Sequence, residues 1–490
     1  MSKKSDALHG AILGIGDKYI ADAEKFVPRR KKNRKIIYSA VAAMLVCAVT
    51  VTAVFVGGGT GTSVSDLPSE PVHHFSPFVA AAADYPETEK YPPLNTMSDS
   101  GYNNTIAKWR EATEEKKANL GTLPIGTTEF FKKTVSEFMT ERDDNVVFSP
   151  TSAYLALSML SECAAGETKD QLLALLGEED TDSVRASANA VWRAAYTDDG
   201  NTRSVLANSL WLRHDMSYNE SLVKTLAEKY FASTFVGEMG SSEYDKMLQD
   251  WINEQTGGNL EEYAGKEKFD PETALSLVST IHFKAEWEHT FSEKWTKKAV
   301  FHGKTDTECD FMSGGGDAAY VGDGFRAIDK YLKNNEYKMT FILPDEGVTP
   351  DELLKNDSVL DFITHTDYSV WANADEIILN VPKFDVDSKL DLIPGLEHLG
   401  VTDAFVPGTA DFSPVSDEAD SPYVSDVSHA ARFYINEEGC EGAAYTRVVM
   451  TVGASATFKR FELTLDRPFI FVVRGVDDLP LFVGVVCDVN

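Results

Sequence analysis

The pattern of apolar and polar residues divides the chain into a short N-terminal part and a long C-terminal part. Between them, Ile36–Val56 is a run of 21 residues without charge that directly follows the basic stretch Arg29–Lys35. A run of this length matches a helix that crosses a bilayer, and its basic flank stays in the cytoplasm. The run is longer than the apolar core of a cleaved signal peptide. It therefore predicts a transmembrane signal anchor at 36–56, with secretion as the alternative if the anchor is cleaved.

The segments on either side of this anchor have different patterns. Residues 1–35 form a basic cytoplasmic segment in which apolar residues between Ala7 and Phe26 recur at roughly helical spacing, which predicts a short amphipathic helix. Residues 57–121 hold Gly, Ser, Pro and scattered charge without sustained periodicity. Such a composition is typical of a linker, here on the extracellular side.

From residue 122 the pattern is that of a large folded domain. Apolar residues at helical spacing predict helices within Thr128–Met139 and Ser152–Leu176. Near the C-terminus, Arg460–Val473 and Pro480–Val486 are rich in β-branched residues and predict a strand hairpin around the turn Gly475–Asp478. Residues 122–490 are therefore predicted to form one α+β domain.

Charge and motif content exclude several classes of function. Residues 1–35 carry 10 Lys and Arg against 4 Asp and Glu, so the rest carries 36 against 73 and a charge near −37. Such a surface repels nucleic acids. The five cysteines form no CxxC or Cys/His cluster, so neither a metal site nor a disulfide framework is indicated. No GxSxG, HExxH, Walker or GxGxxG motif is present, and we expect no cofactor, no catalytic residues and no enzymatic activity.

Several stretches of the predicted domain resemble serpins, the family of serine protease inhibitors, and occur in the order found there. They are Asn145–Ala153 with Leu157–Leu160 and Ala165–Gln171, Ala207–Leu212, Ile252–Asn259, Ile281–Trp287, Leu399–Phe405 with Ala410–Ser413, Val424–Ala430, and Leu465–Phe471 with Pro480–Gly484. The resemblance is to a bacterial-type, membrane-anchored serpin. It implies the serpin fold, with a large central sheet A, sheets B and C, about eight or nine helices and an exposed reactive-centre loop.

The stretch Ile435–Thr446 resembles the hinge at which the reactive loop of a serpin leaves sheet A. In the family, a protease cleaves this loop and stays bound as an acyl-enzyme while the freed segment inserts into the sheet as a new strand. The resemblance assigns this hinge to Glu437, Glu438, Gly439, Cys440, Glu441, Gly442, Ala443, Ala444, Tyr445 and Thr446.

An inserted strand must place every second side chain in the buried interior. One alternating set of the loop is small or apolar, whereas the other holds the charges and the phenol. The first set is Cys440, Gly442, Ala444, Thr446, Val448 and Met450, and the second is Glu441, Ala443, Tyr445, Arg447 and Val449. Cys440 and Gly442 depart from the Thr or Ser and the Ala usual in inhibitory serpins, and glycine weakens a strand.

The resemblance also marks a polar region under sheet A where the sheet must open. Its residues are Ser149, Ser152, Ser279, Trp287 and His429. Ser279 stands where the family usually has asparagine. The purely structural alternatives are helix capping for Ser149 and Ser152, packing for His429 and a core position for Trp287.

The spacing usual in the family places the scissile bond at Gly453–Ala454. Because the stretch from Gly439 to Pro468 is longer than in common members, the bait window stays open over Met450, Thr451, Val452, Gly453, Ala454 and Ser455. These small and aliphatic residues favour elastase-like or subtilisin-like proteases. Arg447 and Lys459 flank the window and leave a trypsin-like target as the alternative.

The sequence therefore predicts a suicide-substrate inhibitor of serine proteases, anchored in the cell membrane by one helix with its serpin domain outside the cell. Its partners would be a target protease, held covalently, and the membrane, and we expect a monomer. The alternative is a non-inhibitory serpin that acts as a surface binding or chaperone-like protein.

Overall fold

The computed structural model describes residues 45–54, 75–91, 99–120, 125–257, 261–333, 335–365, 368–416, 422–439 and 459–489. All of them belong to one unit, Val41–Asn490. The predicted amphipathic helix Ala7–Phe26 lies outside the described residues. So do the hinge residues Cys440–Thr446 and the bait window Met450–Ser455.

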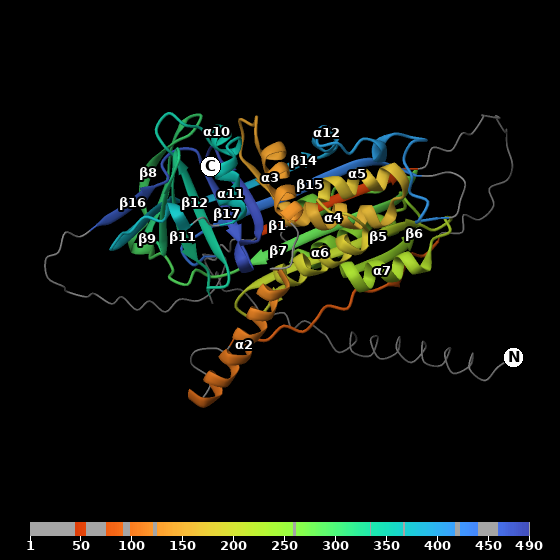
Figure 1. Ribbon diagram of the computed structural model, residues 1–490, viewed down its shortest axis with the longest axis horizontal. Helices are drawn as coiled ribbons and strands as arrows, with labels where there is room; N and C mark the ends of the chain where they lie inside the picture. The colour runs from red at the N-terminus through yellow and green to blue at the C-terminus, as the bar shows by residue number, and fades with distance from the viewer. Residues whose placement is uncertain are drawn as a thin grey trace, which may run out of the picture. The chain divides into compact units, whose positions relative to one another are not determined.

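The largest sheet, sheet A, has eight strands within the described chain (Figure 1). Their order is β14-β15-β1-β7-β5-β6-β2, and β4 pairs with β5 outside this path. The strands are β1 (Leu45–Val54), β2 (Phe78–Ala81), β4 (Thr197–Asp198), β5 (Arg203–Arg213), β6 (Ala232–Gly237), β7 (Thr273–Lys284), β14 (Phe384–Asp391) and β15 (Tyr423–Ile435).

Both faces of sheet A are covered at β5 and β7, and these strands are almost continuously buried. Successive side chains of a strand point to opposite faces. Leu277 and Ile281 of β7 accordingly join the main hydrophobic core, whereas Val278 joins a second core with Trp211 and Phe235. The sheet therefore separates two apolar layers at these strands, whereas β14 alternates buried and exposed residues and presents one face to solvent.

Two smaller sheets complete the domain. Sheet B has the order β10-β11-β12-β17-β18-β3, and sheet C has the order β16-β13-β9-β8. Sheet B comprises β3 (Val146–Phe148), β10 (Ala318–Gly322), β11 (Phe325–Tyr331), β12 (Lys338–Pro344), β17 (Phe469–Arg474) and β18 (Pro480–Val486). Sheet C comprises β8 (Lys297–His302), β9 (Asp306–Gly315), β13 (Glu376–Pro382) and β16 (Arg460–Thr464).

The predicted C-terminal hairpin is confirmed, because β17 and β18 pair antiparallel with Phe471 opposite Gly484. The prediction of one long strand over Arg460–Val473 is wrong. Residues 460–464 form β16, which pairs with β13 in sheet C, and the chain then enters sheet B at Phe469. Pro468 lies in the break, where its missing N–H does not interrupt a ladder.

The helices surround sheets A and B, and α4 packs against β7, β1 and β18 (Figure 1). They are α2 (Asp99–Leu120), α3 (Ile125–Met139), α4 (Pro150–Cys163), α5 (Gly166–Leu176), α6 (Thr181–Ala195), α7 (Glu220–Tyr230), α8 (Ser242–Gln255), α9 (Glu261–Ala264), α10 (Pro350–Leu354), α11 (Asp357–Thr364) and α12 (Ile393–His398). The described 3-10 helices are η1 (Glu293–Trp295), η2 (Tyr368–Val370), η3 (Asp403–Phe405) and η4 (Val476–Asp478).

The helices differ from the prediction in two details. The described part of residues 122–490 holds ten helices, α3 to α12, where eight or nine were expected, because α9, α10 and α12 are only one or two turns long. The apolar stretch Ser152–Leu176 is divided between α4 and α5. The chain turns at Gly166, whose φ of 52° interrupts the helix without steric cost.

The run predicted to cross a membrane contributes a strand to this structure. Its residues Leu45–Val54 form β1 inside sheet A, and the rest of 36–56 lies outside the described residues. Among the described residues, no helix has the length and apolarity that a membrane span needs. The difference has a physical reason, since an uncharged run rich in valine and threonine suits a buried strand as well as a bilayer helix.

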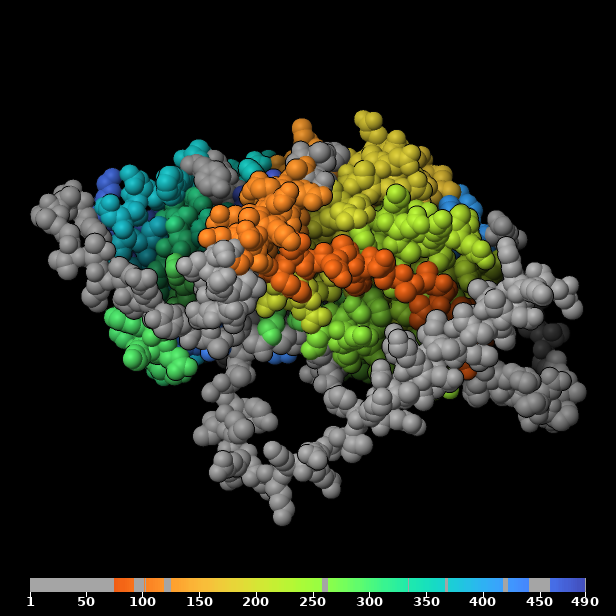
Figure 2. Space-filling model, turned by 90° about the horizontal axis from the view of Figure 1, so that it is seen from below, coloured from red at the N-terminus to blue at the C-terminus, as the bar shows by residue number. Residues whose placement is uncertain are grey.

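The predicted linker 57–121 also contains structure that packs on the domain. Strand β2 pairs with β6, and α2 contacts α6 and η4. Trp109 of α2 is buried, its Nε1 donates a hydrogen bond to Asp199 Oδ2 at 3.2 Å, and its ring meets Tyr91 edge-on. Figure 2 shows this N-terminal segment in orange against the yellow-green surface formed by α6 and α7. This segment is attached by a few aromatic residues spaced far apart in the sequence. It therefore lacks the regular apolar spacing from which its structure could have been predicted.

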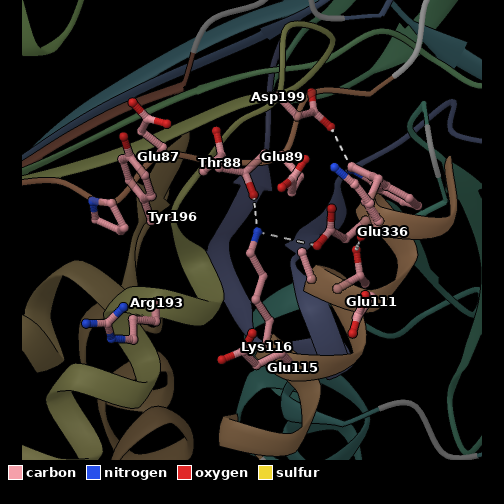
Figure 3. A pocket seen from close by; sticks show the side chains of 16 residues that line it. Glu87, Thr88, Glu89, Glu111, Glu115, Lys116, Arg193, Tyr196, Asp199 and Glu336 are labelled. Carbon is pink, nitrogen blue, oxygen red and sulfur yellow. Dashed lines mark hydrogen bonds and ion pairs between the residues drawn. The ribbon is translucent and has the colours of Figure 1, made fainter. Parts of the chain in front are cut away.

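The 86–89 segment, α2 and α6 enclose a hollow of about 540 Å³ (Figure 3). Many of its labelled side chains are carboxylates, and Lys116 reaches across it to Glu336, with 3.5 Å between Nζ and Oε1. Burial raises the pKa of the Glu336 carboxyl, although Lys116 counteracts part of this effect. The contacts tie α2 to the domain.

Candidate functional site

The first residues of the predicted hinge form a tight turn at the end of β15. The Gly439 N–H donates to the Asn436 carbonyl at 3.3 Å, and the Glu438 N–H donates to Asn436 Oδ1 at 3.0 Å. Gly439 forms isolated β-bridges with Asn436 and also with Glu286, which lies just beyond the end of β7. The turn is therefore attached to both β15 and β7.

Glycine is the only residue type that fits at position 439 of this turn. Its φ is 111°, a conformation that residues with a Cβ rarely adopt. A Cβ at this position would lie 2.3 Å from the Trp287 backbone nitrogen and 2.8 Å from Glu286 Cα. Both are backbone atoms, so the close approach of the two segments requires glycine.

Glu437 anchors the turn through its side chain, which is 10% exposed. Lys383 Nζ lies 2.8 Å from Glu437 Oε1, and the Thr296 hydroxyl donates to the same oxygen at 2.7 Å. Burial alone would raise the pKa of the Glu437 carboxyl, but Lys383 and Thr296 together lower it below its ordinary value. A buried carboxylate of this kind depends on its partners, so these contacts fix the position of the turn.

Trp287 holds the turn from the β7 side. Its Nε1 donates to the Asn436 carbonyl at 2.9 Å, and its backbone N–H donates to the Glu438 carbonyl at 3.1 Å. The ring is buried, packs edge-on against Phe291 and lies 5.7 Å from Lys330 Nζ. Trp287 is thus both a core aromatic and a direct hydrogen-bond partner of the hinge.

Three of the polar residues predicted beneath sheet A lie together. Ser149 is the N-cap of α4, where its side chain accepts a hydrogen bond from the Ser152 N–H at 3.2 Å. The Ser149 N–H donates to His429 Nε2 at 3.1 Å. Capping and contact with the sheet are therefore combined in one serine, which ties the start of α4 to β15.

Ser279 lies on β7, two strands away from β15 in the sheet. Val49 of β1 is the register partner of both Ser279 and His429, so β1 stands between them. The buried Ser279 and Ser152 hydroxyls lack a hydrogen-bond partner among the described residues. Buried hydroxyls in this state cost free energy.

Burial lowers the pKa of His429 to about 3. The neutral imidazole is the form that accepts the hydrogen bond from the Ser149 N–H. A proton on Nε2 would remove this acceptor and place a charge in the apolar interior. Acid therefore weakens the contact between α4 and β15.

Lys383, Thr296, Phe291 and Asn436 also hold the hinge, and none was singled out from the sequence. The Phe291 N–H donates to the Glu437 carbonyl at 2.8 Å. These residues come from segments far apart in the chain, so no local spacing could have identified them. The one available signal was the side-chain amide of Asn436 directly after β15, a residue type that commonly stabilises turns.

Comparisons with known proteins agree with this architecture. The profile of the family "Serpin (serine protease inhibitor)" matches residues 126–489. Serpin-ZX of Arabidopsis thaliana is 26% identical over 364 residues, which is 71% of this chain and 93% of that protein. Plasminogen activator inhibitor 1 of Sus scrofa is 27% identical over 348 residues, or 68% of this chain and 84% of that protein.

A solved structure is similar as well. The thermophilic serpin tengpin in its native state superimposes with a TM-score of 0.66 at 25% identity, covering 74% of this chain and 93% of tengpin. The chain belongs to the serpin family and has the serpin fold. Members of this family are protease inhibitors rather than enzymes, and they typically bind target proteases.

Replacing Gly439 with alanine should destabilise the hinge more than a positive φ alone explains. We expect Gly439→Ala to lower the free energy of unfolding by about 2–4 kcal/mol, because the new Cβ meets backbone atoms. Gly408 is the matched control, since its φ is 76° and nothing lies within 4 Å of an added Cβ. Gly408→Ala should cost about 1 kcal/mol in the same denaturant titration. Equal losses would contradict the hinge geometry.

Removing the His429 imidazole should reduce the acid sensitivity of the domain. Because the folded pKa lies below the ordinary value of 6.5, His429 contributes stability that is complete above pH 6.5 and is lost as the pH falls towards 3. Between pH 7.5 and pH 5, His429→Gln should therefore lose about 2 kcal/mol less than the unchanged chain. His365→Gln, at a side chain that is 68% exposed, is the control. A variant with an unchanged pH profile would refute this role of His429.

Proposed function

We propose that this serpin is a suicide-substrate inhibitor that traps elastase-like or subtilisin-like serine proteases. The protease serine attacks the carbonyl of the residue before the cleaved bond in Met450–Ser455. The peptide C–N bond breaks, the new amino terminus departs, and an ester joins the two proteins. Inhibition requires the freed segment to enter sheet A before water hydrolyses this ester.

The observation that carries the proposal is the position of the turn Asn436–Gly439. Gly439 pairs with Asn436, just beyond the end of β15, and with Glu286, just beyond the end of β7. An antiparallel ladder that continued from this bridge would place the next residues between these two strands. The alternation from Cys440 to Met450 supports the same outcome, since charge occurs only at every second position.

The proposed targets rest on the chemistry of the bait window. Met450–Ser455 contains no lysine or arginine, so an acidic primary pocket of the trypsin type would gain no ion pair. Small and aliphatic residues fit the shallow or apolar pockets of elastase-like and subtilisin-like enzymes. Arg447 and Lys459 keep a trypsin-like enzyme as an outcome of the test.

The proposal also includes anchoring in the cell membrane with the serpin domain outside. It is supported by the 21 uncharged residues Ile36–Val56 and the basic stretch Arg29–Lys35 before them. In a bilayer these residues would form a helix, and β1 would then be absent from sheet A. Cleavage of the anchor would release a secreted inhibitor.

One observation favours a second candidate function. β1 already occupies a place between β15 and β7 in this structure. A sheet that permanently contains this strand has no place for a cleaved loop. The chain would then be a non-inhibitory serpin that acts as a surface binding or chaperone-like protein, and a protease would cleave its loop without being trapped.

The test uses a chain that starts after residue 56, so that β1 is removed while β2 and α2 are kept. It is mixed separately with neutrophil-type elastase, subtilisin and trypsin, and the products are examined on denaturing gels and by mass spectrometry. We expect a covalent complex with elastase or subtilisin and a released peptide that begins within Met450–Ser455. Cleavage by all three without a complex would favour the second candidate.

A matched pair of variants separates insertion from mere cleavage. Ala444→Glu places a carboxylate in the alternating set that must be buried, whereas Ala443→Glu places it in the outward set. Burying the charge costs several kcal/mol, so Ala444→Glu should reduce the trapped fraction by about tenfold or more, while Ala443→Glu retains it. Equal trapping by the two variants would contradict insertion.

A further inference from the structure

Strand β1 comes from outside the region that matches the serpin family, yet it lies inside sheet A. It runs antiparallel to β15 on one side and to β7 on the other. Cys47 is paired with Ala431 of β15 and with Ile281 of β7. Figure 1 shows β1, in red, within the sheet formed by the later green and blue strands.

The hinge defines the register that an inserted loop would take. Gly439 is paired with Asn436 and with Glu286. In an antiparallel ladder, each step forward along one strand is a step backward along its neighbour. Four residues beyond Gly439, Ala443 would therefore be opposite Arg432 of β15 and His282 of β7.

Val46 of β1 is paired with the same two residues, Arg432 and His282. The register of β1 and the register expected for the loop therefore agree on the β15 side and on the β7 side. The agreement on each side rests on a different contact of Gly439. β1 and the loop would also run in the same direction, because each is antiparallel to β15. Equivalent positions are Val46 and Ala443, Cys47 and Ala444, Val49 and Thr446, Thr50 and Arg447, and Val51 and Val448.

We infer that the space between β7 and β15 is a binding site for one extended segment, and that residues 45–54 compete with the reactive loop for it. This inference rests on the proposed function for the identity of the competing loop. The occupancy by residues 45–54 rests on the pairing alone. While β1 fills the site, a cleaved loop finds no unpaired strand edge between β7 and β15.

The chemistry of the site favours an apolar segment. The residues of β15 that face Cys47, Val49 and Val51 in register are buried, and those facing the intervening positions are half-buried. On β7 all the partners are buried. Residues 45–54 carry no charge, so they meet this requirement at every position. β1 also gives both strand edges an antiparallel hydrogen-bonding partner, which buried backbone groups require.

The same residues cannot be a strand in sheet A and part of a bilayer helix. Their backbone groups bond either to β7 and β15 or within the helix. Membrane insertion of Ile36–Val56 therefore empties the site, and a chain that leaves the membrane fills it. Trapping of proteases is restricted to the anchored chain or to a chain that has lost this segment.

Disulfide trapping in the full chain tests the occupancy of the site. Residues directly opposite in a sheet have Cβ atoms about 4.5–5.5 Å apart, close to the span of a disulfide. With Cys440 changed to serine, Ala431→Cys should cross-link to Cys47 in membrane-free buffer under mild oxidation. Ala430→Cys is the control, because its register partner is Ala48 and adjacent residues point to opposite faces. Peptide mapping identifies the bond.

Incorporation into phosphatidylcholine vesicles should reduce the cross-link by about tenfold or more, since the segment then enters the bilayer. Absence of the Cys47 cross-link in buffer, or equal cross-linking of the Ala430→Cys control, would overturn the assignment. So would an equal yield in vesicles and buffer. None of these readouts involves a protease, so they remain decisive if the proposed inhibitory function fails.

A second pair of variants tests the competition with the loop. Val49→Arg introduces a charge opposite the buried His429, whereas Thr50→Arg introduces it where the loop itself carries Arg447. In membrane-free buffer, elastase should cleave the full chain without a complex. Val49→Arg should increase the trapped fraction by about tenfold or more, and Thr50→Arg should not.

The outcomes separate the two claims. If the unchanged full chain traps elastase as well as Val49→Arg does, the competition is refuted and the proposed function stands. If none of the chains traps a protease although the Cys47 cross-link forms, the proposed function fails and the occupancy of the site stands.

Discussion

The structure depends on the hydrogen-bonding requirement of two facing strand edges, those of β7 and β15. β7 is buried on both faces, and every second residue of β15 is buried, so most N–H and C=O groups on these two edges need a partner within the protein. In this structure β1 satisfies both edges. A fold with such a gap in its largest sheet gains free energy from any segment that fills it in register. Inhibition by loop insertion would draw on the same free energy.

Under the proposed function, the hinge determines which segment can fill the gap after cleavage. Its turn is attached to the β7 side by Trp287 and is held from outside the sheet by Lys383 and Thr296 through Glu437. Gly439 allows the two backbones to approach closely. These contacts fix the position of the turn Asn436–Gly439 next to β15 and β7. The polar contact of Ser149 with His429 ties the same sheet to α4. The contact between α4 and the sheet and the stability towards acid are therefore linked through one imidazole.

Local signals in the sequence predicted much of this fold. The C-terminal hairpin and the first helices of the domain follow from periodicity, and the positions of Ser149 and Gly439 follow from motifs of the family. The residues that contact the hinge could not be predicted in this way, because Lys383 and Thr296 approach Glu437 only in the folded chain. α2 was missed since its attachment depends on Trp109 and a few other anchors rather than on an apolar stripe. Residues 45–54 were predicted to be helical because length and lack of charge define a bilayer span, and they also suit a central strand.

The most direct test of this account is the temperature of heat unfolding before and after cleavage of the reactive loop. For a chain that lacks residues 1–56, cleavage within Met450–Ser455 should raise the midpoint by about 10 °C or more, because the freed segment supplies the missing strand. For the full chain in membrane-free buffer, cleavage should leave the midpoint nearly unchanged, because β1 already fills the site. Equal increases in the two chains, or no increase in the shortened chain, would contradict the claim that sheet A has one site that these two segments share.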